Sequence, residues 1–229
     1  GFSGSAGTAV ITKTEARLWT DGRYFIQATA QLKGTTVELM KMGEPGVPEM
    51  NAYIEEVLKE GETLGFDGRV VSVGEGEGYA AIAGKKNAKV NYQVDLIDEI
   101  WEDRPVLSEE PAFNLDVKYA GETVASKLAR IREEMKEAGT NVHVVSTIDD
   151  ICWTLNIRGN DIDFFPLVLS YGIITMDSFE LYIDEKKLDD KLKAKLAKDG
   201  VNLHPYNDIY EDVKKFGSDV VAMIDPGKL

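Results

Sequence analysis

The chain has 229 residues, a length that fits one large domain or two ordinary ones. Its composition, 43% hydrophobic and 29% charged, is typical of a folded globular protein and not of a disordered one. With 26 Lys and Arg against 40 Asp and Glu, the formal net charge is -14, which repels a phosphate backbone. We therefore expect no nucleic-acid partner.

The sequence also argues against a membrane location. No uninterrupted apolar run approaches the roughly 20 residues that a bilayer-spanning helix needs. Residues 1–8 have neither the basic nor the apolar region of a secretory signal. The single cysteine, Cys152, has no partner for an internal disulfide, which fits a reducing compartment. We expect a cytoplasmic protein without a membrane partner.

Short apolar runs alternate with amphipathic segments in the first hundred residues. Thr8–Thr12 and Ala16–Asp21 flank the polar turn 13–15 and predict a β-hairpin. The next expected elements are a helix at 24–32, a strand at 36–40, a helix at 50–59, a strand at 63–67, a helix at 78–84 and a strand at 90–94. This alternation predicts the α/β class.

The segment 102–117 carries two prolines, five acidic residues and little periodicity, which predicts a linker. Beyond it, Thr123–Ala138 has the apolar spacing of an amphipathic helix, which Gly139 ends. The later expected elements are a strand at 142–146, a helix at 149–155, strands at 167–175 and 180–184, helices at 189–197 and 208–216, and a strand at 220–224.

Two parts of the chain resemble each other. Val10–Asp21 aligns without a gap on Ile173–Asp184, and each is an apolar strand, a polar turn and a strand that ends in Asp. Leu64–Gly68 resembles Ala222–Pro226 at nearly the same offset. The matches suggest two copies of one α/β unit. The first copy begins almost at its hairpin, and the second stops at the strand where the first continues. We therefore expect both copies to be truncated.

Motifs for nucleophilic or metal chemistry are incomplete. Residues 1–5, GFSGS, approach a nucleophile elbow but lack its last Gly and precede a strand. His143 and His204 have no further ligands at zinc-binding spacing, so we interpret them as a strand residue and a loop residue. The pairs Asp149–Asp150 and Asp161–Asp163 could attract a hard cation, but the first pair also suits a helix start. We predict no catalytic and no metal-ligating residue in this chain.

Two further features have simple structural interpretations. The glycines of residues 74–78, GEGEG, resemble a dinucleotide-binding loop, but Glu75 and Glu77 would place negative charge where a pyrophosphate should lie. We interpret the segment as a flexible turn into a helix. Cys152 lies among apolar residues, which favours a buried, inert thiol.

Two turns combine acidic, basic and aromatic residues. At residues 19–25, WTDGRYF, a strand runs into a turn, and at residues 153–162, WTLNIRGNDI, a helix end runs into an Arg-Gly-x-Asp turn. Both could be functional. The alternative is that Asp and Arg fix these turns by charge-assisted hydrogen bonds, and the residues alone favour that interpretation.

The two turns belong to an ordered set of segments that resembles one family. The set comprises residues 4–9 (GSAGTA), 18–25 (LWTDGRYF), 100–105 (IWEDRP), 153–161 (WTLNIRGND) and 170–174 (SYGII). It is similar to the three-domain Xaa-Pro aminopeptidases of the creatinase and methionine-aminopeptidase-like metallopeptidases, over essentially the whole chain. The resemblance implies two tandem creatinase-type N-terminal domains, each a ribonuclease-H-like mixed sheet flanked by helices. We expect the first at 1–105, truncated at its start, a linker at 106–117, and the second at 118–229, truncated at its end.

The resemblance also implies a function for the whole protein. In the family, a C-terminal catalytic domain holds two divalent metal ions, typically manganese, and removes the N-terminal residue that precedes proline. None of its ligands can be placed on this sequence. We therefore expect a non-catalytic portion, with no cofactor of its own, that shapes and restricts access to the active site. The implied partners are the catalytic domain, short X-Pro peptides and, in the full-length form, a second copy. A stand-alone binding module or pseudo-enzyme is the alternative.

The resemblance implies one substrate-binding residue, Arg23. In the family the Asp-Gly-Arg-Tyr turn faces the catalytic cleft. A planar guanidinium suits such a position because it can hold a carboxylate or a carbonyl group with two hydrogen bonds. We expect Asp21 and Trp19 to brace the turn.

Overall fold

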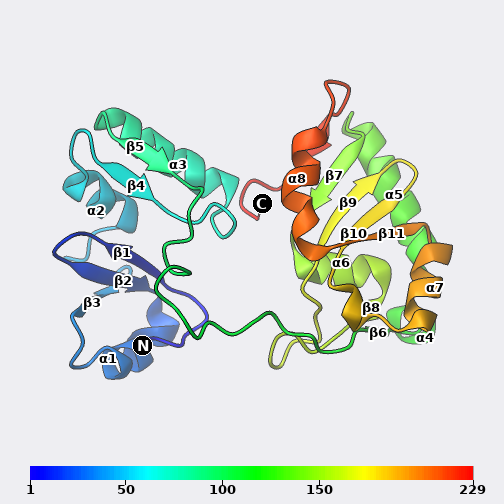
Figure 1. Ribbon diagram of the computed structural model, residues 1–229, viewed down its shortest axis with the longest axis horizontal. Coiled ribbons are helices and arrows are strands. Elements are labelled where there is room, and N and C mark those ends of the chain that lie inside the picture. Colours follow the sequence, from blue (N-terminus) through cyan, green and yellow to red (C-terminus); the bar gives the residue numbers. More distant parts are fainter. Residues whose placement is uncertain (229) are drawn as a thin grey trace. The chain divides into compact units, whose positions relative to one another are not determined.

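The computed structural model describes residues 1–228, which form two compact units divided between Ile100 and Trp101 (Figure 1). Each unit has its own mixed sheet and its own hydrophobic core. None of the helices in residues 1–228 has the length and apolarity that a membrane crossing requires.

The first unit contains a three-stranded sheet and a separate two-stranded sheet, with the orders β1-β2-β3 and β4-β5. The hairpin strands β1 and β2 are antiparallel, whereas β2–β3 and β4–β5 are parallel pairs. Its elements are β1 (Thr8–Ile11), β2 (Ala16–Thr20), a 3-10 turn (Gly22–Tyr24), α1 (Phe25–Gln31), β3 (Val37–Lys41), α2 (Met50–Val57), β4 (Thr63–Gly65), α3 (Val73–Lys85) and β5 (Lys89–Asn91).

Helix α3 corrects one sequence interpretation, because the glycines of residues 74–78 lie inside it and form no flexible turn. A capping box starts the helix: the Ser72 side chain accepts from the Glu75 N–H, and the Glu75 side chain accepts from the Ser72 N–H. Tyr79 and Ile82 then bury the C-terminal part of the helix. The cap and this packing offset the cost of about 1 kcal/mol that each glycine imposes on a helix.

The second unit has one five-stranded sheet with the order β11-β10-β9-β7-β12. The pairs β9–β10 and β7–β9 are antiparallel, and the outer pairs β10–β11 and β7–β12 are parallel. Its elements are β6 (Phe113–Asn114), α4 (Val117–Ala120), α5 (Val124–Glu137), β7 (Val142–Val145), α6 (Ile148–Leu155), β8 (Ile157–Arg158), β9 (Tyr171–Thr175), β10 (Phe179–Tyr182), a 3-10 turn (Glu185–Lys187), α7 (Asp190–Lys198), β11 (Val201–His204), a 3-10 turn (Tyr206–Asp208), α8 (Ile209–Asp212), a 3-10 turn (Val213–Lys215) and β12 (Ala222–Met223).

Helices cover both faces of this sheet (Figure 1). Apolar side chains of α5, α6 and α7 pack against one face in the larger core, and α8 packs against the other face through Ile209. The sheet is therefore buried on both sides, which explains why β9 has apolar residues at the adjacent positions Ile173 and Ile174 and why both are buried.

The structure differs from the sequence prediction at three places in the second unit. Strand β11 was not predicted, and His204 lies in it and not in a loop. The expected helix at 208–216 is a single α-helical turn followed by a 3-10 turn. Residues 112–117, the end of the expected linker, belong to the second unit, because the Ala112 N–H donates to the Lys187 carbonyl at 2.9 Å and β6 pairs with β8.

The internal repeat is confirmed by the strand register. Val10 pairs with Arg17, and the aligned Ile173 pairs with Glu180. Each hairpin ends in an aspartate whose Oδ1 accepts the N–H two residues further on, at 3.0 Å for both Asp21 and Asp184. The two units thus share the hairpin, the turn, a crossover helix and a parallel strand.

Candidate functional site

The turn that carries Arg23 is held in place from two sides. Trp19, at the end of β2, is buried and its indole N–H donates to the Pro48 carbonyl at 2.8 Å. Thr20 is also buried and donates to the Ala6 carbonyl at 2.6 Å. The last residues of β2 therefore fix where the chain leaves the sheet.

Within the turn, Asp21 and Arg23 form a bidentate ion pair. Asp21 Oδ1 accepts from Arg23 Nε at 2.8 Å, and Oδ2 accepts from Nη2 at 2.7 Å. The guanidinium lies 5.2 Å from the centre of the Tyr24 ring, and 67% of its side chain is exposed. The sequence interpretation that Asp and Arg fix this turn by charge-assisted hydrogen bonds is confirmed.

The ion pair keeps both groups charged. Hydrogen bonds from the Arg23 side chain and backbone lower the pKa of Asp21 to about 2, and the same carboxylate raises the pKa of Arg23. Nε and Nη2 serve Asp21, and within residues 1–228 no hydrogen bond is made by Nη1. The outer edge of an oriented, permanent cation is therefore available to a carboxylate or carbonyl group.

The second turn is built differently. Arg158 Nη1 donates to the carbonyls of Cys152 and Ile157 at 2.7 and 2.8 Å, so this arginine closes the end of α6 instead of pairing with Asp161. Asp161 instead forms an ion pair with Lys187 at 2.5 Å, and the two side chains are 1% and 2% exposed. The carboxylate also accepts the Leu169 N–H at 2.7 Å. These contacts give the second turn a structural role.

Two lysines that the sequence pattern did not single out are buried in the second unit. Lys127 donates to the Trp153 carbonyl at 2.6 Å and to Asn156 Oδ1 at 2.7 Å, and its ammonium lies 4.1 Å from the centre of the Trp153 ring. Burial lowers the pKa of Lys127. Its position three residues after Val124, on the apolar face of α5, was the available signal. For Lys187 no local pattern points to the distant Asp161.

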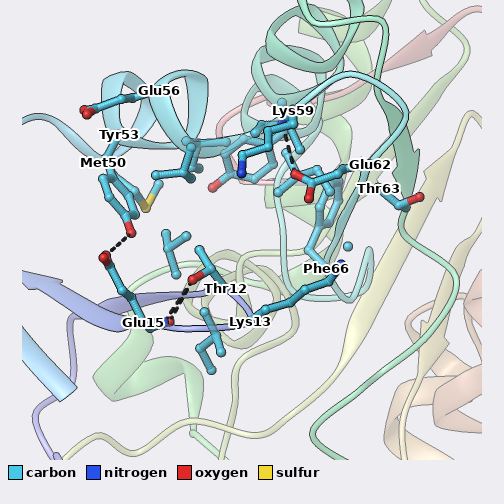
Figure 2. Close-up of a pocket in the computed structure, with 18 of the residues that line it drawn as sticks. Thr12, Lys13, Glu15, Met50, Tyr53, Glu56, Lys59, Glu62, Thr63 and Phe66 are labelled. Atoms are coloured by element: carbon cyan, nitrogen blue, oxygen red, sulfur yellow. Dashed lines mark hydrogen bonds between the residues drawn. The ribbon is translucent and has the colours of Figure 1, made fainter. Parts of the chain in front are cut away.

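A cavity of about 1040 Å³ lies in the first unit, between the β1–β2 hairpin, α2 and β4 (Figure 2). Tyr53 donates to Glu15 Oε2 at 3.0 Å at one end, and Lys59, Glu62 and Phe66 line another part. Arg23 is not among its lining residues. A smaller cavity of about 540 Å³ in the second unit is lined by Lys187 among others.

The remaining candidates lie in the sheet or the core. His143 Nδ1 contacts the Met223 carbonyl at 3.1 Å, and His204 Nε2 contacts Glu180 Oε2 at 2.6 Å. Cys152 is completely buried, which raises the pKa of its thiol and confirms the predicted burial. Within residues 1–228 no three His, Cys, Asp or Glu side chains are grouped so that they could hold a metal ion.

Fold and sequence together place the chain in a family. The model of the creatinase/prolidase N-terminal domain matches residues 1–100, and a second model with the same description matches residues 103–229. The chain therefore belongs to the creatinase/prolidase N-terminal domain family, and it contains two such domains in tandem.

The most informative relatives are aminopeptidases. Aminopeptidase P2 of Arabidopsis thaliana is 40% identical over 233 residues, which cover 100% of this chain and 33% of the relative. Xaa-Pro aminopeptidase app-1 of Caenorhabditis elegans is 38% identical over 92% of this chain and 34% of its own length. The chain spans about a third of the length of these relatives.

A solved structure agrees with the predicted fold. The crystal structure of X-prolyl aminopeptidase from Caenorhabditis elegans, described as a cytosolic enzyme with a di-nuclear active site, superimposes with a TM-score of 0.90 and 36% identity. The superposition covers 97% of this chain and 37% of the enzyme. The predicted class, α/β with two creatinase-type domains, is confirmed.

Proposed function

We propose that this chain is the non-catalytic N-terminal portion of a metal-dependent Xaa-Pro aminopeptidase and restricts access to its active site. The observation that carries the proposal is the pattern of coverage: aminopeptidases P match 92% to 100% of this chain but use only about a third of their own length to do so. In our proposal, a separate catalytic domain binds two divalent metal ions, manganese, and the di-nuclear active site of the X-prolyl aminopeptidase from Caenorhabditis elegans supports this.

The proposal extends to the surroundings of that enzyme. The proposed partners of this chain are the catalytic domain and short X-Pro peptides. The similar X-prolyl aminopeptidase from Caenorhabditis elegans is described as cytosolic, which supports a cytoplasmic location. We propose a first domain at 1–105 and a second domain at 118–229 whose start moves forward to Ala112, because the segment from Ala112 packs with the second unit. The homodimer expected for the full-length form stays a prediction.

Arg23 is the residue of this chain that we assign to the substrate side. Asp21 holds one edge of its guanidinium, so the other edge points in a fixed direction and keeps its charge. A preoriented cation binds a peptide carbonyl or carboxylate with little loss of side-chain entropy. This geometry supports a substrate-binding role for Arg23 in the complete enzyme.

An activity assay tests whether this chain is non-catalytic and the rest of the protein is needed for peptide hydrolysis. The 229-residue chain with manganese should release no N-terminal residue from an X-Pro peptide, whereas the protein extended through the rest of its reading frame should release it. Release by the chain alone contradicts the proposal. A stop codon soon after residue 229, or an extended protein that binds metal but lacks activity, favours the stand-alone module instead.

The role of Arg23 requires the extended enzyme. Arg23→Ala should lower kcat/KM at least tenfold, which corresponds to about 1.4 kcal/mol of transition-state stabilisation, while metal content and thermal midpoint stay unchanged. Lys186→Ala is the matched control, because Lys186 occupies the same position in the turn of the second domain and its side-chain ammonium pairs with the exposed Glu109. Equal kinetics for both variants would remove Arg23 from the substrate side.

A further inference from the structure

Two neighbouring parallel strands of the second unit end where the chain turns in different directions. Strands β10 and β11 run parallel to each other. After β10 the chain enters α7, which packs on one face of the sheet, and after β11 it enters α8, which packs on the other face (Figure 1). In α/β sheets, such a divergence at the carboxyl ends of the strands opens a crevice in which ligands bind.

The smaller cavity, with a volume of about 540 Å³, lies at this place. The segment that follows β10 contributes Asp184 and Lys187 to its lining, and the segment that follows β11 contributes Tyr206 and Asp208. Leu107, ahead of β6, forms part of another wall. The volume is typical of small-molecule pockets, which range from roughly 300 to 1,000 Å³. All of the lining belongs to the second unit.

A buried ion pair at the cavity has unused hydrogen-bonding capacity. The buried Lys187 side chain lines the cavity, and among the described residues its ammonium donates only to Asp161 Oδ2. An ammonium has three N–H groups, so two of them are left without an acceptor. Asp161 Oδ1 is also buried and has no hydrogen-bond partner within residues 1–228. Because buried polar groups are normally paired, the remaining N–H groups point to a ligand atom that accepts hydrogen bonds.

Two carboxylates of the lining have no cation as partner. Asp184 accepts a backbone N–H of its own turn at 3.0 Å, and within residues 1–228 neither Asp184 nor Asp208 forms an ion pair. By contrast, Glu185 pairs with Lys193 at 3.0 Å. The charge of Lys187 is already balanced within its own ion pair. The cavity therefore carries two uncompensated negative charges, which attract a cationic group.

Apolar side chains and one aromatic ring form the rest of the lining. Leu107, Leu169 and Pro205 contribute aliphatic surface. The Tyr206 ring packs against the Tyr171 ring with 5.1 Å between the two centroids, which holds the Tyr206 ring in one orientation. A ligand that matches this lining has an apolar side chain in addition to its charged groups.

We propose that this cavity binds a small molecule with an α-ammonium group and an adjacent carbonyl oxygen, as in a free amino acid or the N-terminal residue of a peptide. The ammonium group lies beside Asp184 and Asp208, and the oxygen accepts from Lys187. An apolar side chain of the ligand packs on Leu169 and Tyr206. The inference rests on this chain alone and holds whether or not the enzyme assignment is correct.

Titration of the 229-residue chain with leucine, followed by backbone amide NMR, tests the proposal without any activity assay. Saturable shifts should appear at the amides of Asp184, Lys187 and Asp208, while the amides of β1 in the first unit stay unchanged. The absence of saturable shifts at these three amides up to about 10 mM leucine would overturn the proposal.

Analogues of leucine test which groups the site recognises. 3-Methylbutylamine lacks the carbonyl oxygen and N-acetylleucine lacks the ammonium group, so each should bind about tenfold more weakly or worse. Leucinamide keeps both groups. If it binds as tightly as leucine, the site accepts peptide N-termini as well as free amino acids, and if it binds much more weakly, the ligand is the free amino acid. Equal affinity for all four compounds would overturn the proposal.

Two variants with the same change in charge separate the cavity from the net charge of the protein. Asp208→Asn removes one carboxylate of the lining and should weaken leucine binding about tenfold without lowering the thermal midpoint, since the Asp208 side chain makes no ion pair within residues 1–228. Asp177→Asn is the matched control, because Asp177 is exposed in the turn between β9 and β10, at the far end of β10. Equal weakening by both variants would overturn the proposal, because it would show attraction by net charge alone.

Discussion

The two copies of the hairpin have the same local structure but very different surroundings. β1 and β2 form it at an open edge, whereas β9 and β10 form it in the middle of a five-stranded sheet. The register and the aspartate turn are nevertheless the same. Local pattern and turn chemistry thus determine the conformation of the hairpin, and its neighbours determine how much it contributes to stability.

At three aligned positions the two units have different amino acids, and each difference matches the surroundings of that position. Gly172 lies beneath the Phe179 ring, where an added Cβ would come within 2.6 Å of a ring carbon. The first unit has alanine, Ala9 and Ala16, at the positions aligned with Gly172 and Phe179. At the same offset, Lys187, which belongs to a buried ion pair, corresponds to Tyr24. The hydroxyl group of Tyr24 forms a hydrogen bond with Ser5 near the surface. The central copy therefore contains packing and charge pairs that the edge copy lacks.

The largest effect should come from the ion pair, which exists only in the second unit. Lys187→Met leaves the Asp161 carboxylate buried without its cation and should destabilise that unit by about 3–5 kcal/mol. Amide exchange in β10 measures the loss, and the amides of β2 serve as reference. Adding Asp161→Leu should restore part of the stability. A double variant as unstable as the single one would show that the buried charge is not the cause.

The hairpin isoleucines test the difference in burial directly. Ile174→Ala should destabilise the second unit by about 2–5 kcal/mol because it leaves a cavity in a packed core. Ile11→Ala, the matched control at the exposed edge, should change stability by less than about 0.5 kcal/mol. Urea unfolding followed by amide exchange in each unit measures both. Similar losses would mean that Ile11 is already covered in solution.

The glycine under Phe179 gives a smaller effect. Gly172→Ala should cost about 1–3 kcal/mol because the ring must move away from the new methyl group. Ala9→Gly makes the reverse change at the aligned position and should cost less, since Ala9 is exposed. Thermal unfolding of the two variants provides the comparison. An unaffected Gly172→Ala variant would show that the Phe179 ring is free to shift.

The smallest effect is the pH dependence of Glu180, which is aligned with Arg17. Burial raises the pKa of Glu180, but hydrogen bonds from Ser178, His204 and Asn202 outweigh it, so the pKa lies below its ordinary value. This carboxylate therefore stabilises the fold above the ordinary pKa and loses its contribution as pH falls through the lower one. Glu180→Gln should flatten the acid side of the stability profile. Parallel profiles for parent and variant would contradict this.

The sequence predicted what depends on local pattern. The amphipathic spacing of α5, the hairpins and the aspartate turns were recognisable because each is specified within a few residues. The repeat was recognisable for the same reason. Arg23 was singled out by its resemblance to a family, and the structure adds its orientation by Asp21.

What the sequence did not predict depends on distant contacts. Asp161 and Lys187 are 26 residues apart, and only the folded sheet brings them together. Strand β11 is four residues long and is specified by pairing with β10 more than by its own composition. The start of α3 was missed because a capping box outweighed the low helix propensity of its glycines.

The completely buried Cys152 is a built-in probe for the opening of the second unit. Its thiolate is the reactive form, and burial both raises its pKa and shields its sulfur, so a thiol reagent reaches it only when the unit opens. Because this is the sole cysteine of the chain, the alkylation rate under native conditions counts openings of the second unit without any signal from the first.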